Sequence, residues 1–180
     1  MSVANAISLG RLFSAPVALW LILSGYDQWA LWLFAAAGLS DAVDGYVARR
    51  WGPASTFGAY LDPIADKALL VAAYVSLGHR GALPLWLVIM VVSRDILIVG
   101  GAILIHTVTD RLSLRPLPVS KLNTAMQIVL AALVLTGLGL GWSVGPWVEA
   151  LIWVVAATTL ASGAAYVVAW GRRFGGDEDT

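Results

Sequence analysis

The feature that most constrains this chain is its succession of long apolar runs separated by short breaks rich in Gly and Pro. The runs cover approximately residues 12–23, 29–48, 58–77, 83–106, 119–140 and 147–170. Several of them reach the roughly 20 residues that an α-helix needs to cross a hydrocarbon core about 30 Å thick. Charged residues make up only 12% of the chain, against about 25% in soluble domains. The sequence therefore predicts an all-α membrane protein with six transmembrane helices.

Six helices of this length leave no room for a separate soluble domain. We therefore expect residues 1–180 to form a single transmembrane domain. Residues 1–11 are predicted to be a short amphipathic N-terminal segment, and residues 172–180 a disordered cytoplasmic tail. The chain contains no cysteine, which excludes disulfides and thiolate metal sites.

The distribution of Lys and Arg predicts the orientation in the membrane. If the N-terminus lies inside, the outer loops hold only Arg80. The inner segments, counted to include the start of the fifth span, then hold Arg11, Arg49, Arg50, Arg111, Arg115, Lys121, Arg172 and Arg173. Basic residues concentrate on the cytoplasmic side of membrane proteins. Both termini are therefore expected in the cytoplasm. We expect the protein to be integral to the bacterial inner membrane.

Four aspartates lie within the predicted second and third helices, where acidic residues are costly. These are Asp41, Asp44, Asp62 and Asp66. On insertion scales an ionised Asp near the centre of a membrane helix costs about 2.5–3.5 kcal/mol. Acidic residues kept at such positions mark functional sites.

The spacing of these aspartates places each pair on one face of its helix. Asp41 and Asp44 are three residues apart, and Asp62 and Asp66 are four apart. Small residues that permit close helix approach share the same stripes: Gly45, Ala48 and Gly58. The two helices could therefore bring four carboxylates together.

Four neighbouring carboxylates need cations to compensate them, and hard divalent ions prefer oxygen ligands. We therefore predict a metal site between the second and third helices. It is expected near the cytoplasmic face, because Arg49 and the Gly52-Pro53 break follow closely after Asp44. The alternative is that the aspartates form interfacial salt bridges with Arg49, Arg50 and Lys67.

The run from Asp41 to Asp66 reads Asp-x2-Asp-Gly-x2-Ala-Arg-x8-Gly-x3-Asp-x3-Asp. It resembles the signature of the CDP-alcohol phosphatidyltransferase family at every fixed position and spacing. The resemblance implies a six-helix enzyme that transfers a phosphatidyl group from CDP-diacylglycerol to an alcohol and releases CMP. It also implies a homodimer.

The same resemblance implies roles for the residues of the motif. The metal ligands would be Asp41, Asp44, Asp62 and Asp66, holding two divalent ions, Mg²⁺ or Mn²⁺. Asp66 would also be the general base that takes the proton of the acceptor hydroxyl. The residues expected to contact CDP-diacylglycerol are Asp41, Gly45, Ala48, Arg49 and Gly58.

The acceptor site is expected further along the chain, at Arg94, Lys121 and Asn123. Relatives that use glycerol 3-phosphate usually carry a second Arg about two turns after the position of Arg94, and residues 99–103 contain no base. A phosphomonoester would want more cations than a phosphodiester. Two alternatives remain: Arg94 and Asp95 could form a buried ion pair only, and Asn123 could serve interhelical hydrogen bonding.

Segments 93–95, 119–127 and 157–162 resemble the eukaryotic-type cardiolipin synthases of this family. We therefore predict phosphatidylglycerol as acceptor and cardiolipin as product. The expected partners are CDP-diacylglycerol, phosphatidylglycerol, membrane lipids and a second copy of the chain, with no nucleic acid. The alternatives are a phosphatidylglycerophosphate synthase and, in another class, a divalent-cation transporter.

Overall fold

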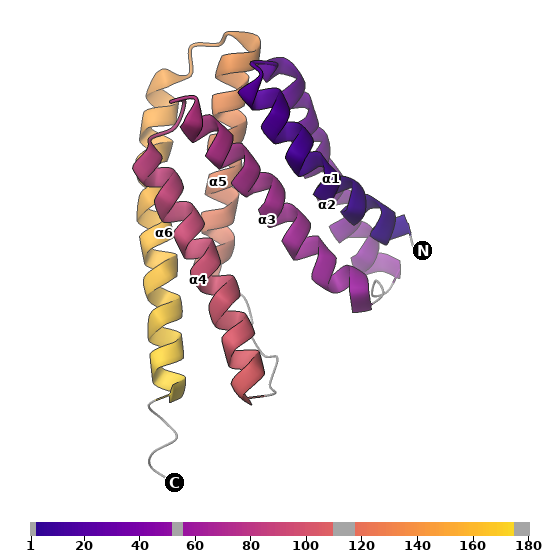
Figure 1. The fold of residues 1–180 in the computed structure, drawn as a ribbon, viewed down its shortest axis with the longest axis vertical. Helices are drawn as coiled ribbons and strands as arrows, with labels where there is room; N and C mark the ends of the chain where they lie inside the picture. The colour runs from indigo at the N-terminus through magenta and orange to yellow at the C-terminus, as the bar shows by residue number, and fades with distance from the viewer. Residues whose placement is uncertain (1–2, 52–55, 110–117, 175–180) are drawn as a thin grey trace. The chain divides into compact units, whose positions relative to one another are not determined.

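The structure is a computed structural model that describes residues 3–51, 56–109 and 118–174 (Figure 1). Within these ranges every element is an α-helix: α1 (Val3–Leu23), α2 (Asp27–Trp51), α3 (Thr56–His79), α4 (Leu85–Thr109), α5 (Pro118–Leu140) and α6 (Gly145–Phe174). The all-α prediction is confirmed for this part of the chain. Two stretches of the described residues are long and apolar enough to cross a membrane, Pro118–Leu140 and Gly145–Ala169.

Two boundaries differ from the sequence-based expectation. The N-terminal segment is not separated from the first span, because α1 runs without a break from Val3 to Leu23 and includes Pro16. Arg11 lies inside this helix and is buried. At the other end, α6 continues through Arg172 and Arg173 to Phe174, which the sequence assigned to the tail. Arginine is a good helix former, and its charge is favourable at a helix C-terminus.

The helix ends follow local sequence chemistry. After α1, the chain turns at Gly25 with a φ of 79°, a conformation that residues with a Cβ rarely adopt. The amide of Tyr26 donates to the carbonyl of Leu21 at 2.9 Å, and that of Gly25 to Ile22 at 3.1 Å. These are the two hydrogen bonds of a Schellman motif. Gly81 ends α3 in the same way, with a φ of 72°.

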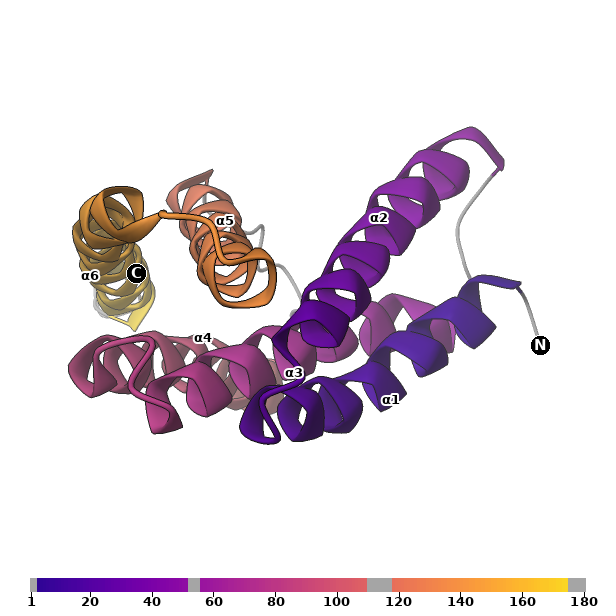
Figure 2. The same cartoon turned by 90° about the horizontal axis from the view of Figure 1, so that it is seen from above.

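The chain divides into two compact units. Unit 1 comprises Met1–Leu85 and Ala131–Gly145, and so contains α1, α2, α3 and the last part of α5. In it, α1 packs more extensively against α3 than against α2 (Figures 1 and 2). The largest fully buried side chains here are Ile22, Tyr74, Leu77, Leu83 and Leu135.

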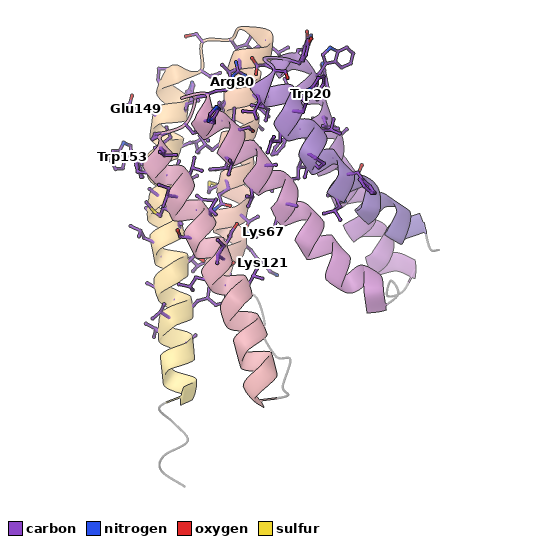
Figure 3. The ribbon with its side chains drawn as sticks, viewed as in Figure 1. Trp20, Lys67, Arg80, Lys121, Glu149 and Trp153 are labelled. Carbon is purple, nitrogen blue, oxygen red and sulfur yellow. The ribbon has the colours of Figure 1, made fainter. Side chains whose placement is uncertain are left out.

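A polar clasp joins the α1–α2 turn to the end of α3 in unit 1. The guanidinium of Arg80, labelled in Figure 3, pairs with both carboxylate oxygens of Asp27, and its Nη1 also donates to the carbonyl of Ile22 at 3.0 Å. The side chains of Arg80 and Asp27 are 27% and 13% exposed. A single residue after α3 therefore satisfies groups at the end of α1 and the start of α2.

The last part of α5 reaches the same turn through a close backbone approach. A Cβ placed on Gly139 would lie 3.0 Å from the carbonyl oxygen of Asp27 and 3.0 Å from the Cα of Gln28. Since real Cβ atoms rarely approach backbone that closely, glycine is the residue that fits this contact. Gly139 therefore allows α5 to lie directly against the start of α2.

Unit 2 comprises Trp86–Leu130 and Pro146–Thr180 and contains α4, the first part of α5 and α6. Its fully buried apolar side chains include Leu87, Val91, Leu130 and Val155. The rings of Trp86 and Trp153 lie 5.6 Å apart and link α4 to α6. Figure 3 shows Trp153 and Glu149 extending from the outer side of α6.

Large apolar side chains also cover the outside of the described helices. Among them are Trp20, Trp29, Trp32, Trp147 and Trp153, each more than half exposed. Soluble monomers rarely expose continuous apolar surface of this kind. A hydrocarbon surrounding removes that cost, in agreement with the apolar sequence.

The Arg80 clasp predicts a measurable coupling. Replacing Arg80 by Gln should lower the stability of the protein in detergent by about 1–2 kcal/mol, because charged hydrogen bonds are lost at a partly exposed site. Asp27→Asn should have a similar effect, and the double variant should be little worse than either single one. Thermal unfolding followed by tryptophan fluorescence measures all three. Fully additive losses would show that the two side chains do not act together.

Candidate functional site

The aspartate motif lies on helical backbone in both of its halves. Asp41 and Asp44 belong to α2, while Asp62 and Asp66 belong to α3. Each pair of aspartates therefore lies on one face of its helix, as the spacing predicts. The structure does not describe the side chains of residues 41–66. This range includes the four aspartates and the predicted CDP-diacylglycerol contacts Gly45, Ala48, Arg49 and Gly58. Their roles stay predictions.

The chemistry of this set suits a divalent cation. Its donors are the oxygens of four carboxylates, two carboxylates on each of two helices, and Mg²⁺ and Mn²⁺ accept such oxygens as ligands. Elsewhere in the chain, the residues whose side chains are described contain no group of three His, Cys, Asp or Glu that could hold a metal ion. The aspartate motif is therefore the candidate metal centre.

The second candidate region is a buried polar cluster in unit 2, centred on Arg94 of α4. Its Nη1 donates to Oδ1 of Asp95 at 2.7 Å. Its Nε donates to the hydroxyl of Ser162 on α6 at 3.1 Å, and Nη2 donates to the same hydroxyl. Nη2 also reaches Ser120 on α5 at 2.6 Å. One guanidinium thus connects three helices.

Burial makes these contacts energetically important. The side chains of Arg94 and Asp95 are 4% and 7% exposed. Taking a charge out of water costs several kcal/mol unless a counter-charge and hydrogen bonds compensate it. The planar fork of arginine provides donors in several directions at once. The predicted acceptor residue Arg94 therefore lies in an ion pair with Asp95, and its role in acceptor binding stays a prediction.

A second set of polar contacts lies one helical turn along α5. Asn123 is fully buried, and its Oδ1 accepts hydrogen bonds from the hydroxyls of Thr158 at 2.9 Å and Thr159 at 3.0 Å, both on α6. Ser120, Asn123 and Gln127 follow the i, i+3, i+7 spacing of one helix face. Gln127 is also fully buried. A polar stripe of α5 therefore faces the interior of unit 2.

The structure does not bury all three predicted acceptor residues in the interior of unit 2. Lys121, labelled in Figure 3, is exposed on α5, whereas Asn123 is fully buried. Residues two apart on a helix point about 200° from one another. The predicted set therefore divides into a buried pair, Arg94 and Asn123, and an exposed cation, Lys121.

Sequence reasoning did not identify the α6 partners as site residues individually. Thr159 and Ser162 are both buried and lie three residues apart, so they share one face of α6. Their spacing on one face of an otherwise apolar helix is the sequence pattern that could have identified these hydroxyl residues. Their partners on α4 and α5 could be identified only from the three-dimensional structure.

The chain is similar in sequence to a family of phosphatidyltransferases and to several known proteins. The family model described as CDP-alcohol phosphatidyltransferase matches residues 1–161. The chain is 34% identical to the rice chloroplastic CDP-diacylglycerol–glycerol-3-phosphate 3-phosphatidyltransferase 1 over 92% of its length, and 31% identical to human cardiolipin synthase (CMP-forming) over 96%. It spans only 56% and 62% of these two relatives. It is also 33% identical to a probable phosphatidylglycerophosphate synthase of Mycobacterium tuberculosis, over 99% of this chain and 86% of that protein.

The Arg94 cluster predicts that Ser162 stabilises unit 2. Ser162→Ala removes the acceptor of two guanidinium N–H groups, and an unsatisfied buried donor costs about 1–3 kcal/mol. The thermal unfolding midpoint in detergent should therefore fall. Ser93→Ala is the matched control, since Ser93 precedes Arg94 on α4 but is exposed. Equal midpoints for the two variants would contradict the importance of the cluster.

Proposed function

The chain belongs to the CDP-alcohol phosphatidyltransferase family, and on this premise we propose that it is a cardiolipin synthase of the membrane. It transfers the phosphatidyl group of CDP-diacylglycerol to phosphatidylglycerol and releases CMP. In this proposal all six helices cross the bacterial inner membrane, with both termini in the cytoplasm and the metal centre near the cytoplasmic face. The protein acts as a homodimer.

The observation that carries the choice of acceptor is the ion pair of Arg94 with Asp95. A phosphomonoester such as glycerol 3-phosphate carries between one and two negative charges near neutral pH. The guanidinium in the buried cluster is already compensated by the neighbouring carboxylate. The cluster therefore offers hydrogen-bonding groups without a net positive charge. Such a site favours a head group of low charge, as in a phosphodiester lipid.

The donor half of the reaction is assigned to the aspartate motif. Asp41, Asp44, Asp62 and Asp66 would hold two divalent cations, Mg²⁺ or Mn²⁺. When bound, these ions would neutralise the diphosphate and stabilise the leaving CMP oxygen. Gly45, Ala48 and Gly58 leave room for the nucleotide because they are small, and Arg49 supplies a cation for its phosphates.

Asp66 has the further role of general base. Its carboxylate takes the proton from the acceptor hydroxyl, whose oxygen attacks the phosphorus that bears the diacylglycerol group. The bond from this phosphorus to the CMP oxygen breaks, and CMP leaves with the electron pair. A positioned base is needed because a neutral hydroxyl is a poor nucleophile.

The alternative within the family is a phosphatidylglycerophosphate synthase. It is supported by the rice and mycobacterial relatives, whose names describe that reaction. Exposed Lys121 could contribute the additional positive charge for glycerol 3-phosphate. A divalent-cation transporter is disfavoured, because its path would need polar groups along both halves of the helices, and the outer halves of α2 and α3 are almost wholly apolar.

The acceptor is decided by a CMP-release assay. Purified protein with CDP-diacylglycerol and Mg²⁺ or Mn²⁺ should release CMP when phosphatidylglycerol is added, and much more slowly with glycerol 3-phosphate. Chelation of the metal should abolish release, because no cation would then neutralise the diphosphate or stabilise the leaving CMP oxygen. A preference for glycerol 3-phosphate would overturn the acceptor, and no release with any alcohol would overturn the enzyme.

The role of Asp66 is tested by Asp66→Asn. This change removes the base but keeps the shape and one oxygen, so kcat should fall by a factor on the order of 10³. Binding of CDP-diacylglycerol, measured with a labelled nucleotide lipid, should be retained. Loss of binding would show that Asp66 is required as a metal ligand rather than as the base.

A further inference from the structure

The amide of Asn123 is held by α6 in an arrangement that the proposed chemistry does not yet use. Its carbonyl oxygen faces two hydroxyls, whereas its Nδ2 has less than 1 Å² exposed and no hydrogen-bond partner. Side-chain amides buried to this degree normally have partners for both polar atoms. The unused atom is a donor.

Counting protons shows that Thr159, rather than Thr158, fixes this arrangement. The Thr158 hydroxyl has a single proton and lies within reach of three acceptors: Asn123 Oδ1, the Val154 carbonyl at 2.9 Å and the Val155 carbonyl at 3.2 Å. The Thr159 hydroxyl is buried, and its acceptor is Asn123 Oδ1. Thr159 therefore donates to the amide oxygen.

The opposite orientation of the amide is less favourable. It would turn Nδ2 toward the two hydroxyls and leave both the amide carbonyl and the Thr159 proton without a partner. The observed orientation leaves only the Nδ2 group unsatisfied. Because each buried unsatisfied polar group is costly, Thr159 holds Asn123 with its donor directed away from α6.

We propose that Thr159 is a positioning residue for acceptor recognition, and that the Nδ2 it orients donates to an oxygen of the acceptor head group. This inference rests on the proposed function. An amide N–H requires an acceptor atom, and the hydroxyl and phosphate oxygens of a glycerol-phosphate head group provide one. Since Nδ2 is enclosed in the structure, the head group displaces neighbouring side chains to reach it, and the donor is satisfied only in the loaded enzyme.

The test compares Thr159→Val with Thr159→Ser in the full-length protein with metal. Valine keeps the shape but removes the hydroxyl, so the KM for phosphatidylglycerol should rise about tenfold, as expected for a lost hydrogen bond. The KM for CDP-diacylglycerol and kcat should change less than twofold. Serine keeps the hydroxyl and should restore the acceptor KM. Asn123→Leu should raise it at least as much, and adding Thr159→Val to Asn123→Leu should have no further effect.

Thr136→Val is the matched control. Thr136 is a half-buried threonine of α5 that donates to the carbonyl of Ala132 on its own helix at 2.7 Å. Its replacement should leave both KM values unchanged. If Thr159→Val lowers only the thermal midpoint, or raises both KM values equally, Thr159 is merely structural and the proposal is overturned.

The outcome is separable from that of the proposed function. If the wild-type protein uses glycerol 3-phosphate instead, the acceptor assignment fails, and the same variants are compared by their KM for that substrate. If no alcohol supports CMP release, the readout becomes the rise in thermal midpoint on adding phosphatidylglycerol in mixed micelles. A rise in the wild type and Thr159→Ser that is absent in Thr159→Val supports the inference, and equal responses overturn it.

Discussion

Backbone hydrogen bonding is the constraint on which the rest of this structure depends. Hydrocarbon offers no partners to peptide groups, so an apolar chain satisfies them within its own helices. Apolar side chains then contribute little to the choice of which helices pack together, because contact with lipid and contact with another helix are chemically similar. Specific association is left to close backbone approaches such as Gly139 against Asp27 and to the few polar side chains. Arg80, Arg94 and Asn123 each connect helices in this way.

The two parts of the proposed reaction differ in the physics that supports them. The proposed donor half places four aspartates on α2 and α3, a concentration of negative charge that suits divalent cations. The residues proposed to bind the acceptor, on α4, α5 and α6, are compensated within the protein, because Arg94 pairs with Asp95 and donates to hydroxyls on the adjoining helices. Strong charge suits a diphosphate with its metal ions, whereas a polar cluster without net charge suits recognition by hydrogen bonds. The family relationship supports the proposed chemistry, and the Arg94 cluster supports the proposed choice of acceptor.

Much of the fold was predictable from the sequence, since apolar length and Gly–Pro breaks define helices locally. The predicted 119–140 corresponds to α5, and 58–77 lies within α3. The ends of α1 and α6 were placed less well, because Arg11 and Arg172 are charged yet good helix formers. The helical phase of Asn123 was readable, but its contact with Thr159 depends on how α5 and α6 are rotated toward each other. That rotation is a property of packing, which no local pattern contains.

The division of α5 between the two units has a consequence for biosynthesis. Unit 1 needs Ala131–Gly145, which leave the ribosome only after α4 and the first part of α5. The contact of Gly139 with Asp27 therefore forms late, after the first four helices have been made. A chain truncated after α4 would therefore lack part of both units. Synthesis runs in sequence order, whereas the packing of unit 1 is completed only by a segment made after most of unit 1.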